Sequence, residues 1–159
     1  MKTGQSYDNE KLAEESRYCD DDGNLVQPAL HIEAAMIKAA ANFRFQGKKT
    51  FKDPFKSAVF IEPELIPHES QEWTIDERPV VVNKSRIIRA RARLDSWALS
   101  FVILVIDERI TGAIVKDVLT DAGQYYGIGD NRPRFGRFEV VGFERVEEAP
   151  EDEPREDTA

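Results

Sequence analysis

The stretch YYGIGDNRPRFGRFEV, residues 125–140, holds three glycines and three arginines ahead of an alternating apolar segment. A dinucleotide-binding glycine loop follows a strand and opens a helix, with the phosphate at the helix N-terminus. Here a helical pattern ends at Tyr126, a strand pattern follows the glycines, and no lysine follows in a phosphate-loop spacing. The stretch is therefore predicted to end a helix at Gly127 and to use Gly129 and Gly136 for positive φ angles or close backbone approach. No cofactor is expected.

Two longer helices are predicted. Pro28 stands at the start of the first, which Gly47 ends, and Thr111 caps the second, which runs to about Tyr126. The first has a narrow, alanine-rich inner stripe that suits close packing on a sheet, formed by Ile32, Ala35, Met36, Ala39, Ala40 and Phe43. The second has an inner face formed by Ile114, Val115, Val118, Leu119, Ala122 and Tyr125. A short helix is also predicted around residues 9–17.

Strand patterns occur at 57–61, 80–82, 87–94, 97–106 and 137–146. Residues 97–106 are apolar on both faces and are predicted to form a central strand. Asp95 and Ser96 predict a tight turn that joins this strand to 87–94. Residues 47–72 contain three prolines and are predicted to form an irregular arm.

The order of these elements predicts an α+β fold of the ferredoxin-like kind, β-α-β-β-α-β, with two helices on one face of an antiparallel sheet. The leading strand is degenerate or absent, with Leu25 and Val26 as its stub. The chain is expected to divide into a polar, acidic N-terminal segment at 1–24, a single domain at 25–145 and a disordered acidic tail at 146–159.

Charge is distributed unevenly along the 159 residues, whose formal net charge is −8. Residues 1–28 carry −4 and residues 146–159 carry −6, whereas residues 29–145 carry +2. Such acidic ends are either solvated tails or screens for a basic surface. The single cysteine, Cys19, fits a reducing cytoplasm, and the absence of a Cys/His cluster argues against a zinc site. No apolar run approaches the ~20 residues of a membrane span, so no membrane association is expected.

Three arginines of the segment RIIRARARL are spaced two residues apart: Arg89, Arg91 and Arg93. In a strand they project from one face, and the small side chains between them project from the other, where a helix would cover them. Two interpretations of the arginine face stand. The arginines pair with acids on neighbouring strands, such as Glu139 or Glu144, or they form a track for the phosphates of a nucleic acid.

Two further groups of basic residues are candidates for binding a polyanion. The first comprises the loop arginines, Arg132, Arg134 and Arg137, one of which Asp130 would otherwise pair. The second comprises the predicted arm, with Lys48, Lys49, Lys52, Lys56, Phe51 and Phe55. Lysines that hold phosphates and phenylalanines that stack on bases are the chemistry that a single strand requires. The alternative is that both phenylalanines pack onto the core.

A glycine-rich loop between the last helix and the last strand of a ferredoxin-like unit resembles the RAMP proteins, the RNA-binding subunits of CRISPR effector complexes. The loop residues that carry this resemblance are Gly127, Gly129, Arg134, Gly136 and Arg137, and PALHIEAAMIKAA resembles the first RAMP helix. The region from Pro28 to Phe143 also resembles a group of phage and prophage proteins that share the GIGD.RP.FGRFEV ending. The loop has Asp-Asn-Arg-Pro where many RAMP proteins have more glycine.

The resemblance and the arginines together predict a non-catalytic protein of phage or prophage origin. It is expected to bind RNA or another single-stranded nucleic acid, and RNA is favoured over DNA. The alternative is a protein-interaction or structural module. It would complete its open sheet edge with a further copy of itself or another chain, by association with or mimicry of a CRISPR-type effector subunit. Some RAMP proteins cleave RNA, but nothing in the sequence brings His31 and His68 together, and Asp20 to Asp22 have ordinary turn composition. No enzyme activity is expected.

Overall fold

The computed structural model describes residues 9–146, so the tail predicted at 146–159 lies, apart from its first residue, outside the described residues. The helices are α1 (Asn9–Glu15), α2 (Ala29–Ala40), α3 (Lys52–Ala58) and α4 (Gly112–Asp121), which continues into a π-helical turn, η1 (Ala122–Tyr126). The strands are β1 (Val26–Pro28), β2 (Arg44–Gln46), β3 (Lys49–Thr50), β4 (Val59–Glu62), β5 (Leu65–Pro67), β6 (Thr74–Val82), β7 (Ser85–Arg93) and β8 (Val102–Val105). The fold is mixed α+β with small antiparallel sheets.

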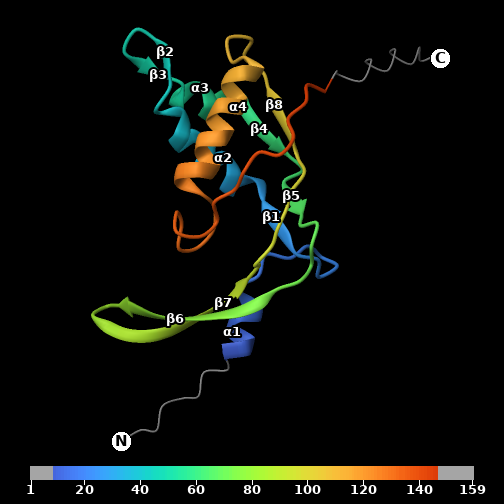
Figure 1. The fold of residues 1–159 in the computed structure, drawn as a ribbon, viewed down its shortest axis with the longest axis vertical. Helices are drawn as coiled ribbons and strands as arrows, with labels where there is room; N and C mark the ends of the chain where they lie inside the picture. Colours follow the sequence, from blue (N-terminus) through green and yellow to red (C-terminus); the bar gives the residue numbers. More distant parts are fainter. Residues whose placement is uncertain (1–8, 147–159) are drawn as a thin grey trace, which may run out of the picture.

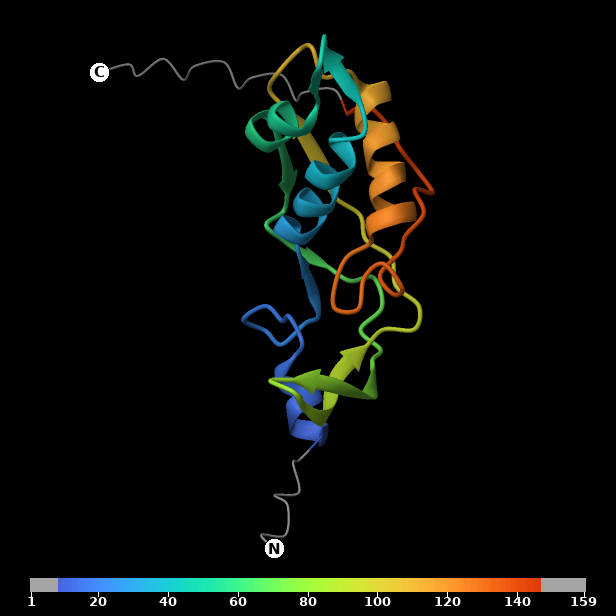
Figure 2. The same cartoon turned by 90° about the vertical axis from the view of Figure 1, so that its left-hand side faces the viewer.

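Helix α2 lies at the centre of the hydrophobic core, between α4 and the ladder formed by β4 and β8 (Figures 1 and 2). Its predicted inner stripe is confirmed, because every stripe residue within the helix is buried. Alanines on that stripe let neighbouring elements approach closely. The helix ends at Ala40, earlier than the predicted stop at Gly47, which instead occupies the turn between β2 and β3 with φ +55°.

Helix α4 begins as predicted, because the Thr111 side chain accepts a hydrogen bond from the Ile114 backbone N–H at 3.3 Å. It packs against α2 through Val115, Val118 and Leu119, all buried. Tyr125, predicted on the inner face, is exposed because the wider π-helical turn redirects the last residues of the helix.

The strand pairing differs from the predicted order. Strand β7 pairs with β6, and β8 pairs with β4, so the hairpin turn predicted at Asp95 and Ser96 is wrong. The actual hairpin turn is formed by Asn83 and Lys84, with φ angles of +49° and +64°. Two successive positive φ angles belong to the turn that matches the twist of a two-residue hairpin. The short asparagine side chain makes that conformation accessible.

The apolar segment predicted as a central strand is paired on one side only. Within 97–106, residues 102–105 form β8, whose ladder runs from Val59 opposite Val105 to Glu62 opposite Val102. The segment 137–146 was predicted as the last strand, but it belongs to no ladder among the described residues. It runs alongside the α4 side of the body as a separate length of chain (Figure 2).

The long β6–β7 hairpin lies below the main body with α1 against it (Figure 1). Its alanine face is covered by a helix, as the alternation in RARAR predicted. Ala90 of β7 and Ala13 of α1 are both buried, and the Ser16 hydroxyl accepts a hydrogen bond from the Ala92 N–H at 2.9 Å. The arginines of β7 therefore project from the opposite face, towards the main body.

Residues 47–72 contain more regular structure than predicted, because α3, β4 and β5 lie within them. The side chains of Phe51 and Phe55 are 6% and 1% exposed and belong to the hydrophobic core. The interpretation of these two residues as stacking platforms for bases is therefore wrong, and the alternative packing is confirmed. The arm lysines, by contrast, are all exposed.

Replacing a core phenylalanine tests this correction. We expect Phe55→Ala to lower the free energy of unfolding by about 3–5 kcal/mol, since it leaves a cavity between α2 and α3. Phe60→Ala, whose side chain is 41% exposed on β4, is the control and is expected to cost about 1 kcal/mol. Urea denaturation followed by circular dichroism measures both. Equal losses for the two variants would contradict the placement of Phe55 in the core.

Candidate nucleic-acid interface

The glycine loop at 127–136 is held together by its own backbone. The Gly127 N–H donates to the Ala122 carbonyl at 2.8 Å and ends the helical turn with φ +67°. The Ile128 N–H donates to the Gly136 carbonyl at 3.0 Å and closes the loop. A Cβ on Gly136 would stand 1.6 Å from the Ile128 carbonyl oxygen. The predicted helix stop, positive φ angles and close approach are all confirmed.

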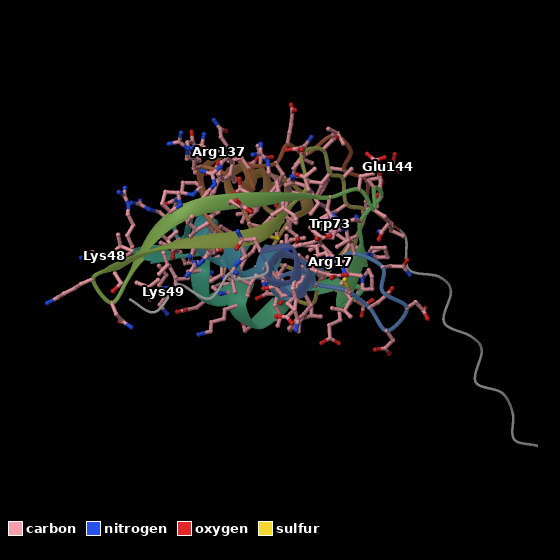
Figure 3. The ribbon with its side chains drawn as sticks, turned by 90° about the horizontal axis from the view of Figure 1, so that it is seen from below. Arg17, Lys48, Lys49, Trp73, Arg137 and Glu144 are labelled. Atoms are coloured by element: carbon pink, nitrogen blue, oxygen red, sulfur yellow. The ribbon has the colours of Figure 1, made fainter. Side chains whose placement is uncertain are left out.

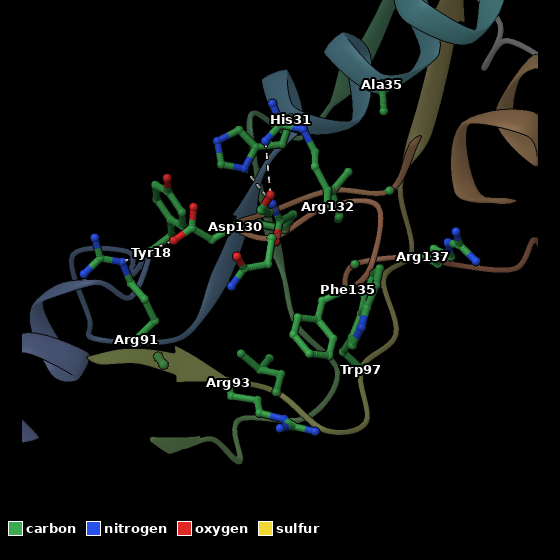
Figure 4. Close-up of a pocket in the computed structure, with 18 of the residues that line it drawn as sticks. Tyr18, His31, Ala35, Arg91, Arg93, Trp97, Asp130, Arg132, Phe135 and Arg137 are labelled. Atoms are coloured by element: carbon green, nitrogen blue, oxygen red, sulfur yellow. Dashed lines mark hydrogen bonds and ion pairs between the residues drawn. The ribbon is translucent and has the colours of Figure 1, made fainter. Parts of the chain in front are cut away.

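This loop forms one wall of an open cleft of about 1020 Å³. The other walls come from the turn after α1, the start of α2 and the end of β7 (Figure 4). Its charged lining is mostly basic, with seven cationic residues, Arg17, Lys38, Arg91, Arg93, Arg132, Arg134 and Arg137, and three acids, Asp76, Asp95 and Asp130. The lining of the cleft is therefore positively charged, although the chain as a whole has a net charge of −8.

The arginines of β7 are paired with acids, though not with Glu139 or Glu144. Asp130 lies 3.7 Å from Arg89 and 3.5 Å from Arg91, and so joins the loop to the hairpin. Arg93 contacts Asp95 at 2.6 Å and Asp76 at 3.6 Å. Such ion pairs are expected if the β7 arginines serve to stabilise the fold. Their side chains are partly exposed, and such pairs contribute little to stability.

The loop arginines have a different environment. The Arg132 guanidinium donates to the Gly129 carbonyl at 3.1 Å. Within residues 9–146, none of Arg132, Arg134 and Arg137 has a carboxylate within ion-pair distance, so Asp130 does not pair with them as the alternative required. All three are exposed, and all three line the cleft.

An aromatic contact fixes the loop on the hairpin. The Phe135 ring is covered by the Arg78 guanidinium at 4.3 Å and by that of Arg93 at 5.6 Å. Guanidinium groups over an aromatic face are attracted by its π electrons. Figure 4 shows Phe135 beside Trp97 and Arg93 at the lower side of the cleft. The loop is therefore anchored at both of its sides, by Asp130 and by Phe135.

Sequence reasoning missed several residues of the cleft. Arg17 lies over the Trp73 ring at 4.7 Å (Figure 3), and Lys38 comes from the outer part of α2. Tyr18 and Tyr125 are 53% and 57% exposed at its surface. No local pattern singles out these residues, because they reach the cleft from elements that are distant in the sequence.

His31 occupies the upper side of the cleft. The Gln27 side-chain amide lies 2.8 Å from its Nδ1, and the Tyr18 ring meets it edge-on at 5.0 Å between centroids. Burial and the charge of Arg132 lower the pKa of His31. His68 also lines the cleft, with its Nδ1 buried and without a hydrogen-bond partner among the described residues, and burial lowers its pKa.

The remaining candidates lie elsewhere. Asp20 closes the turn at 20–24, where its Oδ1 accepts from the backbone N–H groups of Asn24 and Asp22 at 2.9 and 3.0 Å. The hydrogen bond from the Asn24 backbone is the main cause that lowers the pKa of Asp20.

Among residues 9–146 no group of three acids, histidines or cysteines is placed to hold a metal. The arm lysines, with β3 and α3, stand at the far end of the body from the hairpin (Figure 1). No helix in the described part of the chain is long and apolar enough to cross a bilayer.

No protein-family model matches this chain, and no curated protein or solved structure matches it.

The close approach of Gly136 to Ile128 can be tested by adding one methyl group. We expect Gly136→Ala to lower the free energy of unfolding by about 2–4 kcal/mol, because the Cβ would overlap a backbone carbonyl at positive φ. Gly129→Ala has a similar φ, +89°, but open space around its Cβ, and is expected to cost about 1 kcal/mol. Urea denaturation measures the difference, and a smaller effect at Gly136 than at Gly129 would contradict the loop geometry.

The two histidines predict a pH dependence of stability. In the folded chain the pKa values of both histidines are lower than the value of 6.5 that they have when the chain is unfolded. As the pH falls to about 6.5 and below, the unfolded chain therefore binds more protons than the folded chain. The stability contribution of the neutral rings is therefore present above about pH 6.5 and is lost as the pH falls through the lowered pKa values. Urea midpoints between about pH 7.5 and 5 should fall with pH, and the double variant His31→Gln, His68→Gln should show a smaller fall. An unchanged slope in that variant would contradict the assignment.

Proposed function

We propose that this chain binds single-stranded nucleic acid in the cleft beside the glycine loop. The observation that carries the proposal is the set of three exposed loop arginines without a carboxylate partner among the described residues, in a cleft where cations outnumber acids. Arginine is suited to phosphate because its planar, forked guanidinium binds two oxygens at once. The phosphates of a nucleic acid would supply the anionic partners that the three loop arginines lack among the described residues.

The aromatic residues of the cleft support a single strand over a duplex. Tyr18 and Tyr125 are exposed and line the same cleft as the loop arginines, and unstacked bases gain about 1–3 kcal/mol by stacking on such rings. The bases of a duplex are already stacked on each other and cannot use these rings. RNA is the first choice of strand, on the resemblance to RAMP proteins.

In this proposal Asp130 competes with the bound strand for two arginines of β7. It neutralises Arg89 and Arg91 in the free protein through weak, exposed ion pairs. A phosphate of the bound strand would compete with Asp130 for the same guanidinium groups. The β7 arginines are therefore secondary contacts, and the loop arginines are primary ones.

The ferredoxin-like, RAMP-like form of the α+β fold belongs to this proposal, with phage or prophage origin and a non-catalytic role. Its support is the order of the elements. When the intervening elements β2, β3, α3 and β5–β7 are set aside, α2, β4, β8 and α4 follow one another in the order α-β-β-α, and the extended segment 137–146 stands where the last strand would be.

Fluorescence anisotropy with labelled oligonucleotides tests the proposal. We expect the wild type to bind single-stranded RNA more tightly than a duplex of the same sequence, with an affinity that falls with salt. The triple variant Arg132→Ala, Arg134→Ala, Arg137→Ala should reduce the slope of log K against log salt by about 2, since each lost phosphate contact on a single strand removes about 0.7.

The matched control is Lys48→Ala, Lys49→Ala, Lys52→Ala, which removes the same charge from the far end of the body. It should leave the salt slope and the affinity close to wild type. Equal losses in the two triple variants would mean that only net charge matters. The absence of binding to single-stranded RNA, single-stranded DNA and duplex at low salt would overturn the proposal.

A further inference from the structure

His31 is a titratable group that lies beside the loop arginines in the open cleft of about 1020 Å³, which we call the basic cleft. It is the third residue of α2, and its side chain lines the cleft. Figure 4 shows the imidazole with Tyr18 on one side and Arg132 on the other. His31 is therefore next to a loop arginine that has no carboxylate partner among the described residues.

Two contacts fix the orientation of the His31 ring. The side-chain amide nitrogen of Gln27 lies 2.8 Å from Nδ1, and the Tyr18 ring meets the imidazole edge-on at 5.0 Å between centroids. An amide nitrogen is a donor, so Nδ1 accepts and the neutral ring carries its proton on Nε2. Within residues 9–146, Nε2 has no hydrogen-bond partner. The Nε2–H group is therefore the donor that remains for a ligand.

The ring can take up a second proton without leaving this position. Rotation of the Gln27 amide exchanges its nitrogen with its oxygen, and Oε1 then accepts a hydrogen bond from the newly protonated Nδ1. The imidazolium keeps its Nε2–H and adds a full positive charge. Protonation of His31 therefore changes the charge of the cleft without a change of fold.

The free protein disfavours that charge. Burial and the positive charge of Arg132 lower the pKa of His31, and the positive end of the α2 dipole acts in the same direction. The elements around the ring bring further charges to the cleft, namely the cations Arg17 from the turn after α1, Lys38 from α2 and Arg91 from β7, and the acid Asp130 from the loop.

Asp130 does not offset the charge of Arg132, because its carboxylate is engaged with the arginines of β7. An anion next to both His31 and Arg132 would reverse the preference for the neutral ring. A phosphate could accept hydrogen bonds from the Arg132 guanidinium and from His31 Nε2–H together. An opposite charge within about 4–6 Å favours the protonated ring and raises its pKa.

We infer that His31 and Arg132 together hold one phosphate of the bound strand, and that His31 takes up a proton when this phosphate binds. The inference rests on the proposed function, since it concerns the same cleft and the same strand. Linkage then fixes the sign of the pH dependence. A ligand that raises the pKa of His31 binds more tightly to the protonated protein, so the affinity for the strand rises as the pH falls.

Fluorescence anisotropy with labelled oligouridylate of about 12 nucleotides tests the inference. Neither uracil nor a phosphodiester titrates near neutral pH, and the probe carries no terminal phosphate, whose second pKa of about 6 would confuse the result. At constant salt, binding to the full chain should tighten at least about threefold between about pH 8 and pH 6.

Two histidine variants form a matched pair. His31→Gln keeps a side-chain donor but cannot become charged, so it should lose the tightening at pH 6. His68 is the other histidine that lines the cleft, and His68→Gln should keep the tightening. His31→Lys carries its charge at both pH values, and its affinity for the strand should not change between them.

Proton NMR of the imidazole Cε1–H supplies a measurement that a merely structural role of His31 would not affect. The pKa of His31 should rise by about 1 or more when oligouridylate saturates the cleft. In the free protein, Arg132→Ala should raise the same pKa, because it removes the neighbouring positive charge. Lys52→Ala removes a charge from the far end of the body and should leave the pKa of His31 unchanged.

Three results would overturn the inference while the proposed function stands. One is equal affinity for oligouridylate at both pH values, and another is a pH dependence that His31→Gln retains. The third is a pKa of His31 that does not change when the strand saturates the cleft. Absence of oligouridylate binding at both pH values, even at low salt, would instead overturn the proposed function together with this inference.

Discussion

The hydrogen bond from Ile128 to Gly136 is the constraint on which the arrangement of the charged surface depends. It closes the glycine loop at a backbone separation that no residue with a Cβ permits at position 136. The closed loop then carries Asp130 to the hairpin and Phe135 between two guanidinium groups. A local backbone geometry thus sets the position of a hairpin that would otherwise touch the body through few contacts, and it forms the basic cleft between them.

The electrostatics of the molecule follow from this placement. The chain is acidic overall, yet its loop arginines gather in one cleft with cations from the turn after α1, from α2 and from β7. Acids approach the β7 arginines and leave the loop arginines without carboxylate partners in the described part of the chain. A polyanion bound here would gain most from the unpaired group.

The hydrophobic core is organised around helix α2. Helix α2 packs between α4 and the two-stranded ladder of β4 and β8, whereas the segment 137–146 joins no ladder among the described residues. The small residues of α2 allow its neighbours to pack closely around it.

The sequence by itself determined the features that depend on neighbouring residues. The inner stripe of α2, the Thr111 cap, the glycine stop at 127 and the alternation of arginine with alanine in β7 were all predicted correctly, because helical and strand periodicity are properties of consecutive residues. The tertiary structure decided which strands pair, that Phe51 and Phe55 are core residues, and that Arg17, Tyr18 and Lys38 join the loop arginines. Those outcomes depend on contacts between segments that are distant in the sequence. Several segments could bury the same apolar surface or form the same backbone hydrogen bonds, and local sequence patterns do not determine which of them does so.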